Sequence, residues 1–166
     1  MGDAEFLRYL KDKNAIEKLV FSYATALDRR PLHLLTPMAT DNLHFNYGGV
    51  FEGDTPDAWT AMIQSKLGGC APSQHLFSNV RINTDYSASI DSASVDFYGR
   101  VMHAGKAKER NILFDFWGEY QCTLLRVATD THRGGRFCDV KQMPFHNTML
   151  WVSGYPPTTR CHPTTR

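Results

Sequence analysis

Three kinds of side chain in this sequence could carry acid–base chemistry at one site. Asp28 falls in the last turn of a predicted N-terminal helix, about 100° around the axis from Leu27, and so at the edge of its apolar face. Tyr23 shares the face of Leu27, Tyr47 ends a strand-like run, and His75 belongs to the run SQHLFSN. An imidazole with a pKa near ~6.5 can take up a proton at neutral pH, and a phenol can donate a hydrogen bond to a developing oxyanion.

Each candidate also has a purely structural explanation. Asp28 could end the helix in a turn or bond to Arg29 or Arg30, and His75 could be a core histidine bonded to a backbone carbonyl. The two tyrosines could pack in the ordinary amphipathic way, with the hydroxyl at a rim or in water. The residues alone leave these alternatives open.

The elements that position these residues follow from hydrophobic periodicity. Apolar residues recur at three- and four-residue spacing from Asp3 to Asp28, which predicts a helix, and Pro31 ends it. Thr55 is a typical N-cap ahead of Pro56. The other N-terminal elements that we predict are a short helix within 31–42, strands at 43–47 and 50–52 around a glycine turn, and a helix that ends at Gly68-Gly69.

From residue 73 onward the apolar period changes to two. Long strands are predicted at Ser73–Thr84, Ala88–Ala104, Ile112–Ala128 and Arg136–Ser153. Helices followed by consecutive strands predict an α+β fold, in which a cone-shaped, curved antiparallel sheet is capped by the N-terminal helices. Such a sheet can enclose a pocket at one end.

Length and charge exclude several classes of function. The 166 residues fit one domain, which we place at 1–154, with a proline-rich tail at 155–166 that is expected to be loosely ordered or to lie over a neighbour. The net charge of +1 predicts binding to neither nucleic acid nor a membrane surface. No apolar window is long enough for a membrane span, and the N-terminus lacks a secretory signal, so a cytoplasmic protein is expected.

Common cofactor and metal signatures do not occur. The sequence has no P-loop, no GxGxxG and no HExxH, and its histidines are scattered. The cysteines stand singly, and the Cys161-His162 pair falls short of a tetrahedral set. We therefore expect free thiols at Cys70, Cys122, Cys138 and Cys161, no metal and no cofactor.

Residues 10–153 contain a series of soft motifs in a fairly specific order. They are SYATALDRRPLHLL, LHFNYGGVFEG, SQHLFSNVRI and MLWVSG. In this order the chain resembles the SnoaL-like branch of the nuclear transport factor 2-like superfamily, which includes scytalone dehydratase, hexachlorocyclohexane dehydrochlorinase and polyketide cyclases. The resemblance is specific for fold and much less so for reaction, because the same cone hosts many activities.

The resemblance implies roles for particular residues. Asp28 stands where an aspartate orients a catalytic histidine, and the matching histidine is His75, which would act as the base. Tyr47 resembles a tyrosine that helps to hold a water against the substrate carbonyl, and Tyr23 could supply a second hydroxyl. One departure concerns the strand FYGRVMH, where a second pocket histidine would follow a tyrosine but Gly99 stands instead. His103, farther along, is expected to be a partly exposed strand residue without a role.

Other polar residues are candidates for substrate binding. In the strand FDFWGEYQC, alternation puts Trp117 and Glu119 on one face and a more apolar set on the other, so these two residues face either the cup or solvent. Asn79 shares the parity of His75 and either lines the pocket or marks a bulge. His146 and Thr148 share a strand face where the resemblance predicts polar contacts to the substrate.

The sequence therefore predicts a cofactor-independent acid–base enzyme that acts on an apolar small metabolite of polyketide, terpenoid or steroid-like type. A dehydratase or other lyase is the first expectation, and an isomerase or cyclase with the same groups is the second. A non-catalytic binding subunit, such as a dioxygenase small subunit, and a protein-interaction module are the alternatives outside catalysis. Because one sheet face lacks a cover, a homodimer or homotrimer is expected on physical and family grounds.

Overall fold

A computed structural model describes residues 2–68, 70–85, 91–105, 112–126 and 136–151. For 70–72, 105, 112–114 and 136–151 only the backbone is described. The predicted tail at 155–166 lies outside the described residues. No helix in these ranges is both long and apolar enough to cross a membrane.

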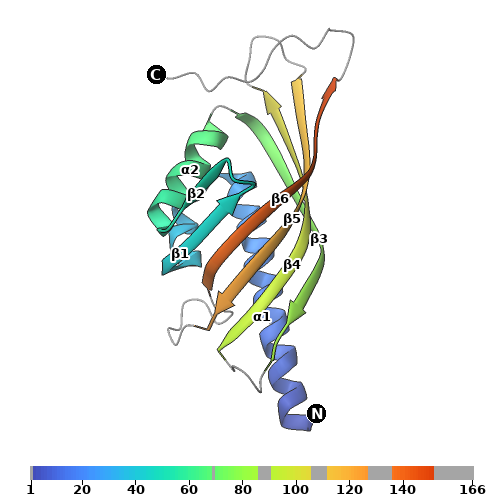
Figure 1. The fold of residues 1–166 in the computed structure, drawn as a ribbon. Coiled ribbons are helices and arrows are strands. Elements are labelled where there is room, and N and C mark those ends of the chain that lie inside the picture. Colours follow the sequence, from blue (N-terminus) through green and yellow to red (C-terminus); the bar gives the residue numbers. More distant parts are fainter. Residues whose placement is uncertain (1, 69, 86–90, 106–111, 127–135, 152–166) are drawn as a thin grey trace.

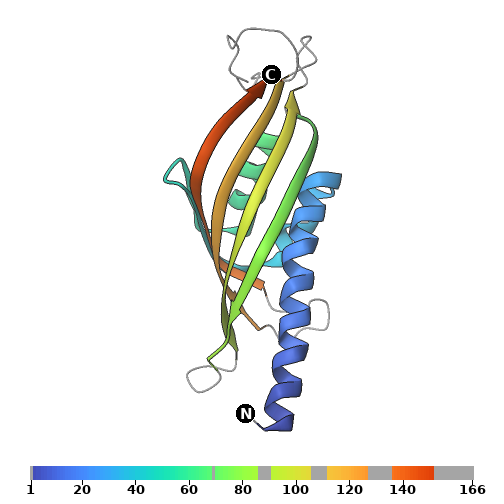
Figure 2. The same cartoon turned by 90° about the vertical axis from the view of Figure 1, so that its right-hand side faces the viewer.

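Helix α1 (Asp3–Arg29) runs along the sheet, and its N-terminal end extends past the strands (Figures 1 and 2). The side chains that recur along its apolar face, such as Val20, Tyr23 and Leu27, are buried. The helix ends because Arg30 adopts a left-handed conformation with φ 68°, while its N–H still bonds to the Ala26 carbonyl. The predicted first helix is confirmed, and its last turn carries Asp28.

The segment after α1 differs from the prediction. The expected short helix within 31–42 is two 3-10 turns, Leu32–Leu34 and Thr36–Met38, and strand β1 (Ala39–Tyr47) begins directly after them. Pro37 has no N–H to donate to a carbonyl four residues earlier, which disfavours a continuous α-helix there. The predicted short strand and the next helix are found as β2 (Phe51–Gly53) and α2 (Pro56–Gly68).

The strands form one sheet in the order β2-β1-β6-β5-β4-β3. Its long members are β3 (Cys70–Asn83), β4 (Ser92–Gly105), β5 (Ile112–Leu125) and β6 (Arg136–Trp151). All pairs are antiparallel except β1 with β6, which is parallel. The long strands bend together, and the helices lie on the concave side (Figure 2). The predicted α+β fold with a curved sheet is confirmed.

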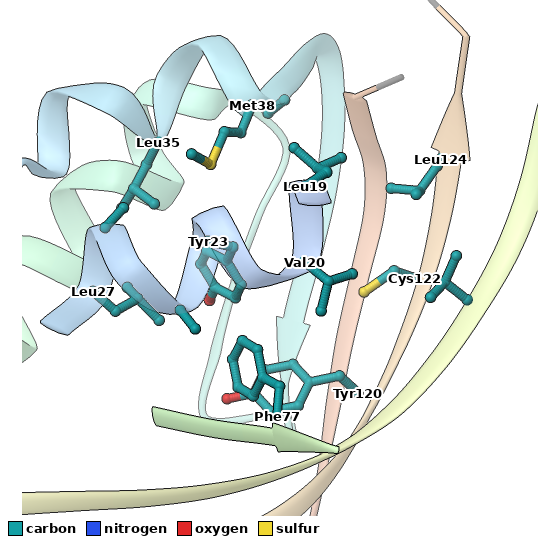
Figure 3. Close-up of a cluster of buried hydrophobic side chains, with 14 of the residues drawn as sticks. Leu19, Val20, Tyr23, Leu27, Leu35, Met38, Phe77, Tyr120, Cys122 and Leu124 are labelled. Atoms are coloured by element: carbon teal, nitrogen blue, oxygen red, sulfur yellow. The ribbon is translucent and has the colours of Figure 1, made fainter. Parts of the chain in front are cut away.

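The core lies between α1, the 3-10 turns and the concave face of the sheet (Figure 3). Val20 from α1 meets Phe77, Tyr120 and Cys122 from the strands there, and Cys122 is buried without forming a disulfide. Gly99 is required beneath these rings, because a Cβ at this position would come within 2.6 Å of the Tyr120 ring. Aromatic side chains thus fill the middle of the cone, and a cavity remains toward the end where β3 begins.

Candidate active site

A cavity of about 410 Å³ lies between α1, α2, the β1–β2 hairpin and the concave face of β3, β4 and β5. Its walls are mostly apolar, and their polar side chains are those of Tyr23, Tyr47, Tyr120, His75 and His103, with Lys66 as a charged residue of the lining. The remaining lining residues are Leu27, Gly48, Val50, Phe51, Met62, Ile63, Leu67, Val101 and Phe116. A cavity of this size and composition suits an apolar small molecule with a few polar groups.

His75 and Asp28 form a close pair beside the cavity. The Nδ1 atom of His75 lies 2.7 Å from Oδ1 of Asp28. The backbone N–H of His75 also donates to both carboxylate oxygens, at 3.0 and 3.1 Å. The carboxylate is therefore held by side chain and backbone of the same residue. With Nδ1–H donating to Asp28, the Nε2 atom of His75 keeps its lone pair and can accept a proton.

Burial sets the protonation state of this histidine. The His75 side chain is only 5% exposed, against 26% for Asp28. Burial lowers the pKa of His75 below its usual value, the hydrogen bond and charge of Asp28 oppose this, and the positive charge of Arg30 lowers it further. His75 is accordingly neutral at pH 7, which is the state that a general base requires.

Tyr23 and Tyr47 form a pair of phenols in the lining of the same cavity. Their hydroxyl oxygens are 2.9 Å apart, and the indole Nε1–H of Trp59 donates to the Tyr47 oxygen at 2.8 Å. If Tyr23 donates within the pair, Tyr47 keeps its proton to donate to a ligand. Burial raises the pKa of both tyrosines well above the usual range, so both remain neutral donors.

Trp59 had no place in the sequence prediction. It is fully buried and stacks on Tyr23 with ring centroids 5.3 Å apart. Its ring and its N–H therefore hold both phenols in place. The repeat of Trp59, Ile63 and Leu67 along α2 could have shown its burial, but not the hydrogen bond.

His103 lines the cavity and was expected to have no role there. Its ring centroid lies 5.4 Å from that of His75. Burial, and then the neighbouring His75, lower the pKa of His103 to about 4, so it is neutral at pH 7. Strand parity was the available signal, since His103 alternates in step with the buried Phe97 and Val101.

Trp117 and Glu119 were predicted to bind substrate, and this placement is wrong. Tyr120 and Cys122 of β5 are buried in the core, so the alternate positions face the outer side of the sheet. Trp117 is 49% exposed. Glu119 pairs with Arg81 at 3.0 Å, away from the cavity. The more apolar face of β5 is turned inward, because burial of this face removes more apolar surface from water.

Of the other predicted contacts, Asn79 does not line the described cavity. Asn79 is exposed, with φ 53°, where the register of β3 shifts between Ser78 and Arg81, so the bulge is the correct alternative. The side chains of His146 and Thr148 lie outside the described residues. Their backbone positions pair with Trp117 and Asp115, respectively.

Metal binding has no support among the described side chains. No three histidine, cysteine or carboxylate groups there come together as a set of ligands. The arrangement that the structure does show is a histidine hydrogen-bonded to a carboxylate, and a hydrogen-bonded pair of tyrosines, with the histidine and both tyrosines lining one cavity.

The family of the chain follows from a family model. The model described as the SnoaL-like domain matches residues 8–137. The chain therefore belongs to the SnoaL-like family, within the nuclear transport factor 2-like superfamily. No curated protein matches it in sequence.

Solved structures share the fold at low sequence identity. A protein of Novosphingobium aromaticivorans that is named as a candidate scytalone dehydratase has 19% identity and a TM-score of 0.75, over 93% of this chain and 98% of that one. Hexachlorocyclohexane dehydrochlorinase LinA-type3 of Novosphingobium barchaimii has 18% identity and a TM-score of 0.70, over 92% and 99%. A protein of N. aromaticivorans described as NTF2-like with a cystatin-like fold has 15% identity and a TM-score of 0.69, over 87% and 89%.

Proposed function

We propose that this protein is a cofactor-independent lyase that removes an acidic proton from an apolar small molecule, with dehydration as the first expectation. The observation that carries the proposal is the shared cavity: a neutral, carboxylate-bound histidine and two neutral phenols line the same 410 Å³ space. Proton abstraction next to a carbonyl needs these two functions, a base for the proton and a donor for the oxygen.

The first step uses the His75–Asp28 pair. Nε2 of His75 takes a proton from the carbon next to the substrate carbonyl, and the C–H electron pair moves into the enolate. Asp28 accepts the Nδ1–H hydrogen bond throughout, so it keeps the ring oriented and stabilises the imidazolium. The apolar walls exclude water from the separated charges.

The second function belongs to the phenol pair. The carbonyl oxygen of the substrate accepts a hydrogen bond from Tyr23 or Tyr47, and this bond strengthens as the oxygen becomes negative. If the substrate carries a leaving group on the carbon β to the carbonyl, the enolate expels it, and the imidazolium can protonate the leaving oxygen. Without a leaving group, return of the proton to another carbon gives isomerisation, and attack on an internal electrophile gives ring closure.

Elimination is preferred because of what the family and the fold neighbours suggest. Proteins of this fold are named for removal of water and of hydrogen chloride. The proposal takes from them only the class of reaction. Polyketide, terpenoid or steroid-like ketones are the substrate classes that suit the cavity.

Deuterium exchange tests proton abstraction without knowledge of the substrate. We expect the protein to catalyse exchange of the α-protons of 1-tetralone in D₂O, followed by NMR. His75→Gln should remove this catalysis, whereas His44→Gln should retain it. His44 is the matched control, because it also lies 2.7 Å from a carboxylate, that of Asp54, but on the surface. Equal exchange by wild type and His75→Gln would overturn the proposal.

A panel of cyclic β-hydroxy ketones then tests the reaction class. Formation of the unsaturated ketone by wild type and its loss in His75→Gln would support a dehydratase. Exchange without elimination across the panel would favour the isomerase or cyclase alternative.

A further inference from the structure

The cavity opens at the end formed by the β1–β2 hairpin and the C-terminal turn of α2. Among the described lining residues, Gly48, Val50 and Lys66 are exposed, whereas His75 is buried. A residue that both lines a cavity and is exposed to solvent lies at the opening of that cavity. The mouth is therefore at the hairpin, and the proposed base lies deeper inside.

The mouth and the base also belong to opposite edges of the sheet. Strand β2, with Phe51, is one edge of the order β2-β1-β6-β5-β4-β3, and β3, with His75, is the other. Helix α2 packs on the hairpin, and α1 packs on β3 (Figure 1). A ligand whose reacting carbon lies at His75 therefore points its far end towards the mouth.

Lys66 is the charged residue of the described lining, and it stands at this mouth. Its Nζ atom lies 4.0 Å from the centroid of the Phe51 ring. This cation–π contact holds the ammonium group, with its three N–H donors, between the helix and the hairpin. The adjacent Glu52 alternates to the other face of β2, where its carboxylate accepts a hydrogen bond from Asn46 at 3.4 Å. The ammonium group is thus placed to meet an anion at the opening.

The charges along the cavity determine where an acidic group of a ligand can lie. At the inner end, the carboxylate of Asp28 is bound to His75 and repels a second anion. The apolar walls in the middle would remove water from a charge without replacing its hydrogen bonds, which is costly. At the mouth, water and the Lys66 ammonium group are both within reach of the charge. An acidic group therefore suits the mouth and neither of the other regions.

We propose that Lys66 binds a carboxylate of the substrate at the mouth, while the substrate carbonyl lies at the phenol pair and the neighbouring carbon lies at His75. This inference rests on the proposed function and narrows its substrate class to apolar ketones with a carboxylate at the end remote from the carbonyl. A carboxylate is preferred to a phosphate dianion, because one ammonium group balances one negative charge. Lys66 is then a specificity-determining residue outside the proton-transfer machinery.

Binding of two matched ketones to the full chain tests this site. The probes are the 6-carboxylate and the 6-carboxamide of 1-tetralone, which are similar in size but differ by one negative charge at pH 7. Position 6 lies on the aromatic ring, at the end remote from the carbonyl. We expect wild type to bind the carboxylate about 3- to 10-fold more tightly at low salt, with a smaller preference in about 0.5 M sodium chloride. Titration calorimetry or NMR gives both dissociation constants.

Variants assign the preference to its residue. Lys66→Met keeps an unbranched side chain without the charge and should reduce the preference to less than twofold. Lys66→Glu should reverse it, so that the carboxamide binds more tightly. Lys18→Glu is the matched control and should retain the preference, because it changes the net charge equally but lies on the exposed side of α1, outside the described lining. Circular dichroism verifies that each variant is folded.

The outcomes separate this inference from the proposed function. Equal binding of the two ketones by wild type would overturn the site at Lys66, as would a preference that survives in Lys66→Met. An equal loss of preference in Lys18→Glu and Lys66→Glu would assign the effect to the net charge of the protein and would also overturn it. Deuterium exchange of 1-tetralone, which has no acidic group, tests the base at His75 independently of these results.

Discussion

The described residues include two histidine–aspartate pairs with the same contact distance in very different surroundings. Nδ1 lies 2.7 Å from a carboxylate oxygen in both the His44–Asp54 pair and the His75–Asp28 pair. The side chains of the first pair are 49% and 82% exposed, and those of the second are 5% and 26% exposed. Contact distance is therefore not what distinguishes a candidate catalytic pair from a surface pair.

The His75–Asp28 pair differs from the surface pair in its burial and in its hydrogen bonds to the backbone. Asp28 accepts three hydrogen bonds from one residue, and the ring of that residue lines a cavity. Asp54 and His44 meet at the surface, where water competes for both partners and a pair of this kind contributes little. His75 is the histidine that is placed to act on a ligand, because it is buried, held in one orientation and next to a cavity.

The largest expected effect comes from Asp28→Asn. Loss of the carboxylate leaves the imidazole in an uncontrolled tautomer, so the rate of 1-tetralone exchange should fall by about 100-fold or more. Asp54→Asn, the equivalent change in the surface pair, should leave the rate within twofold. The double variant Asp28→Asn/His75→Gln should be no slower than His75→Gln alone, since the two groups act as a unit. Additive losses would mean that Asp28 acts independently of His75.

Loss of one phenol should have a smaller effect than Asp28→Asn, because the two phenols share the donor role. Tyr47→Phe should slow exchange by about 10-fold, because Tyr23 can still donate to the enolate oxygen, whereas Tyr23→Phe/Tyr47→Phe should approach the 10²- to 10³-fold loss that is typical of an oxyanion donor. Trp59→Phe removes the indole donor and should slow exchange less than either single tyrosine variant does. An unchanged rate in the double tyrosine variant would exclude the phenols from the site.

Acid should destabilise the protein through the buried cavity histidines. The unfolded chain takes up a proton at His103 near pH ~6.5, whereas the folded chain does so only near a pKa of about 4. Stability should therefore fall as the pH drops from 6.5 towards 4, by roughly 2 kcal/mol from this residue. Urea unfolding at pH 7 and pH 4.5 measures the loss, which His103→Phe should reduce and His44→Gln should leave unchanged. An equal acid loss in His103→Phe would contradict the assignment.

The smallest effect is expected on the outer face. Glu119→Gln breaks the pair with Arg81, which is 61% exposed, so the free energy of unfolding should change by no more than about 1 kcal/mol. Exchange of 1-tetralone should stay within twofold, because this carboxylate faces away from the cavity. A large loss of exchange would mean that Glu119 affects the site despite its place on the outer face.

Much of the site could be predicted from the local pattern of the sequence. The apolar stripe of α1 put Asp28 at the edge of a buried face, and the period-two runs placed His75 and Tyr47 on strands. Resemblance to a family then paired Asp28 with His75. The placements on helix and strand succeeded because periodicity depends on neighbours a few residues away.

The errors lie where a face or a register had to be chosen. Alternation along β5 separates Trp117 and Glu119 from Tyr120, but it does not state which set looks inward. The bulge after Ser78 breaks the parity that had placed Asn79 with His75. The sequence pattern could not decide between the two alternatives in either case, because both are compatible with the same strand.

By itself, then, the sequence determined the order of helices and strands, the α+β class and the residue types available for acid–base chemistry, since all of these follow from local periodicity and composition. Only the tertiary structure decided that Trp59 holds Tyr47 and that His103 lies beside His75. Each of these relations joins separate elements across a curved sheet. They depend on how the strands pair and bend around the core, which fixes the separation of side chains far apart in the chain.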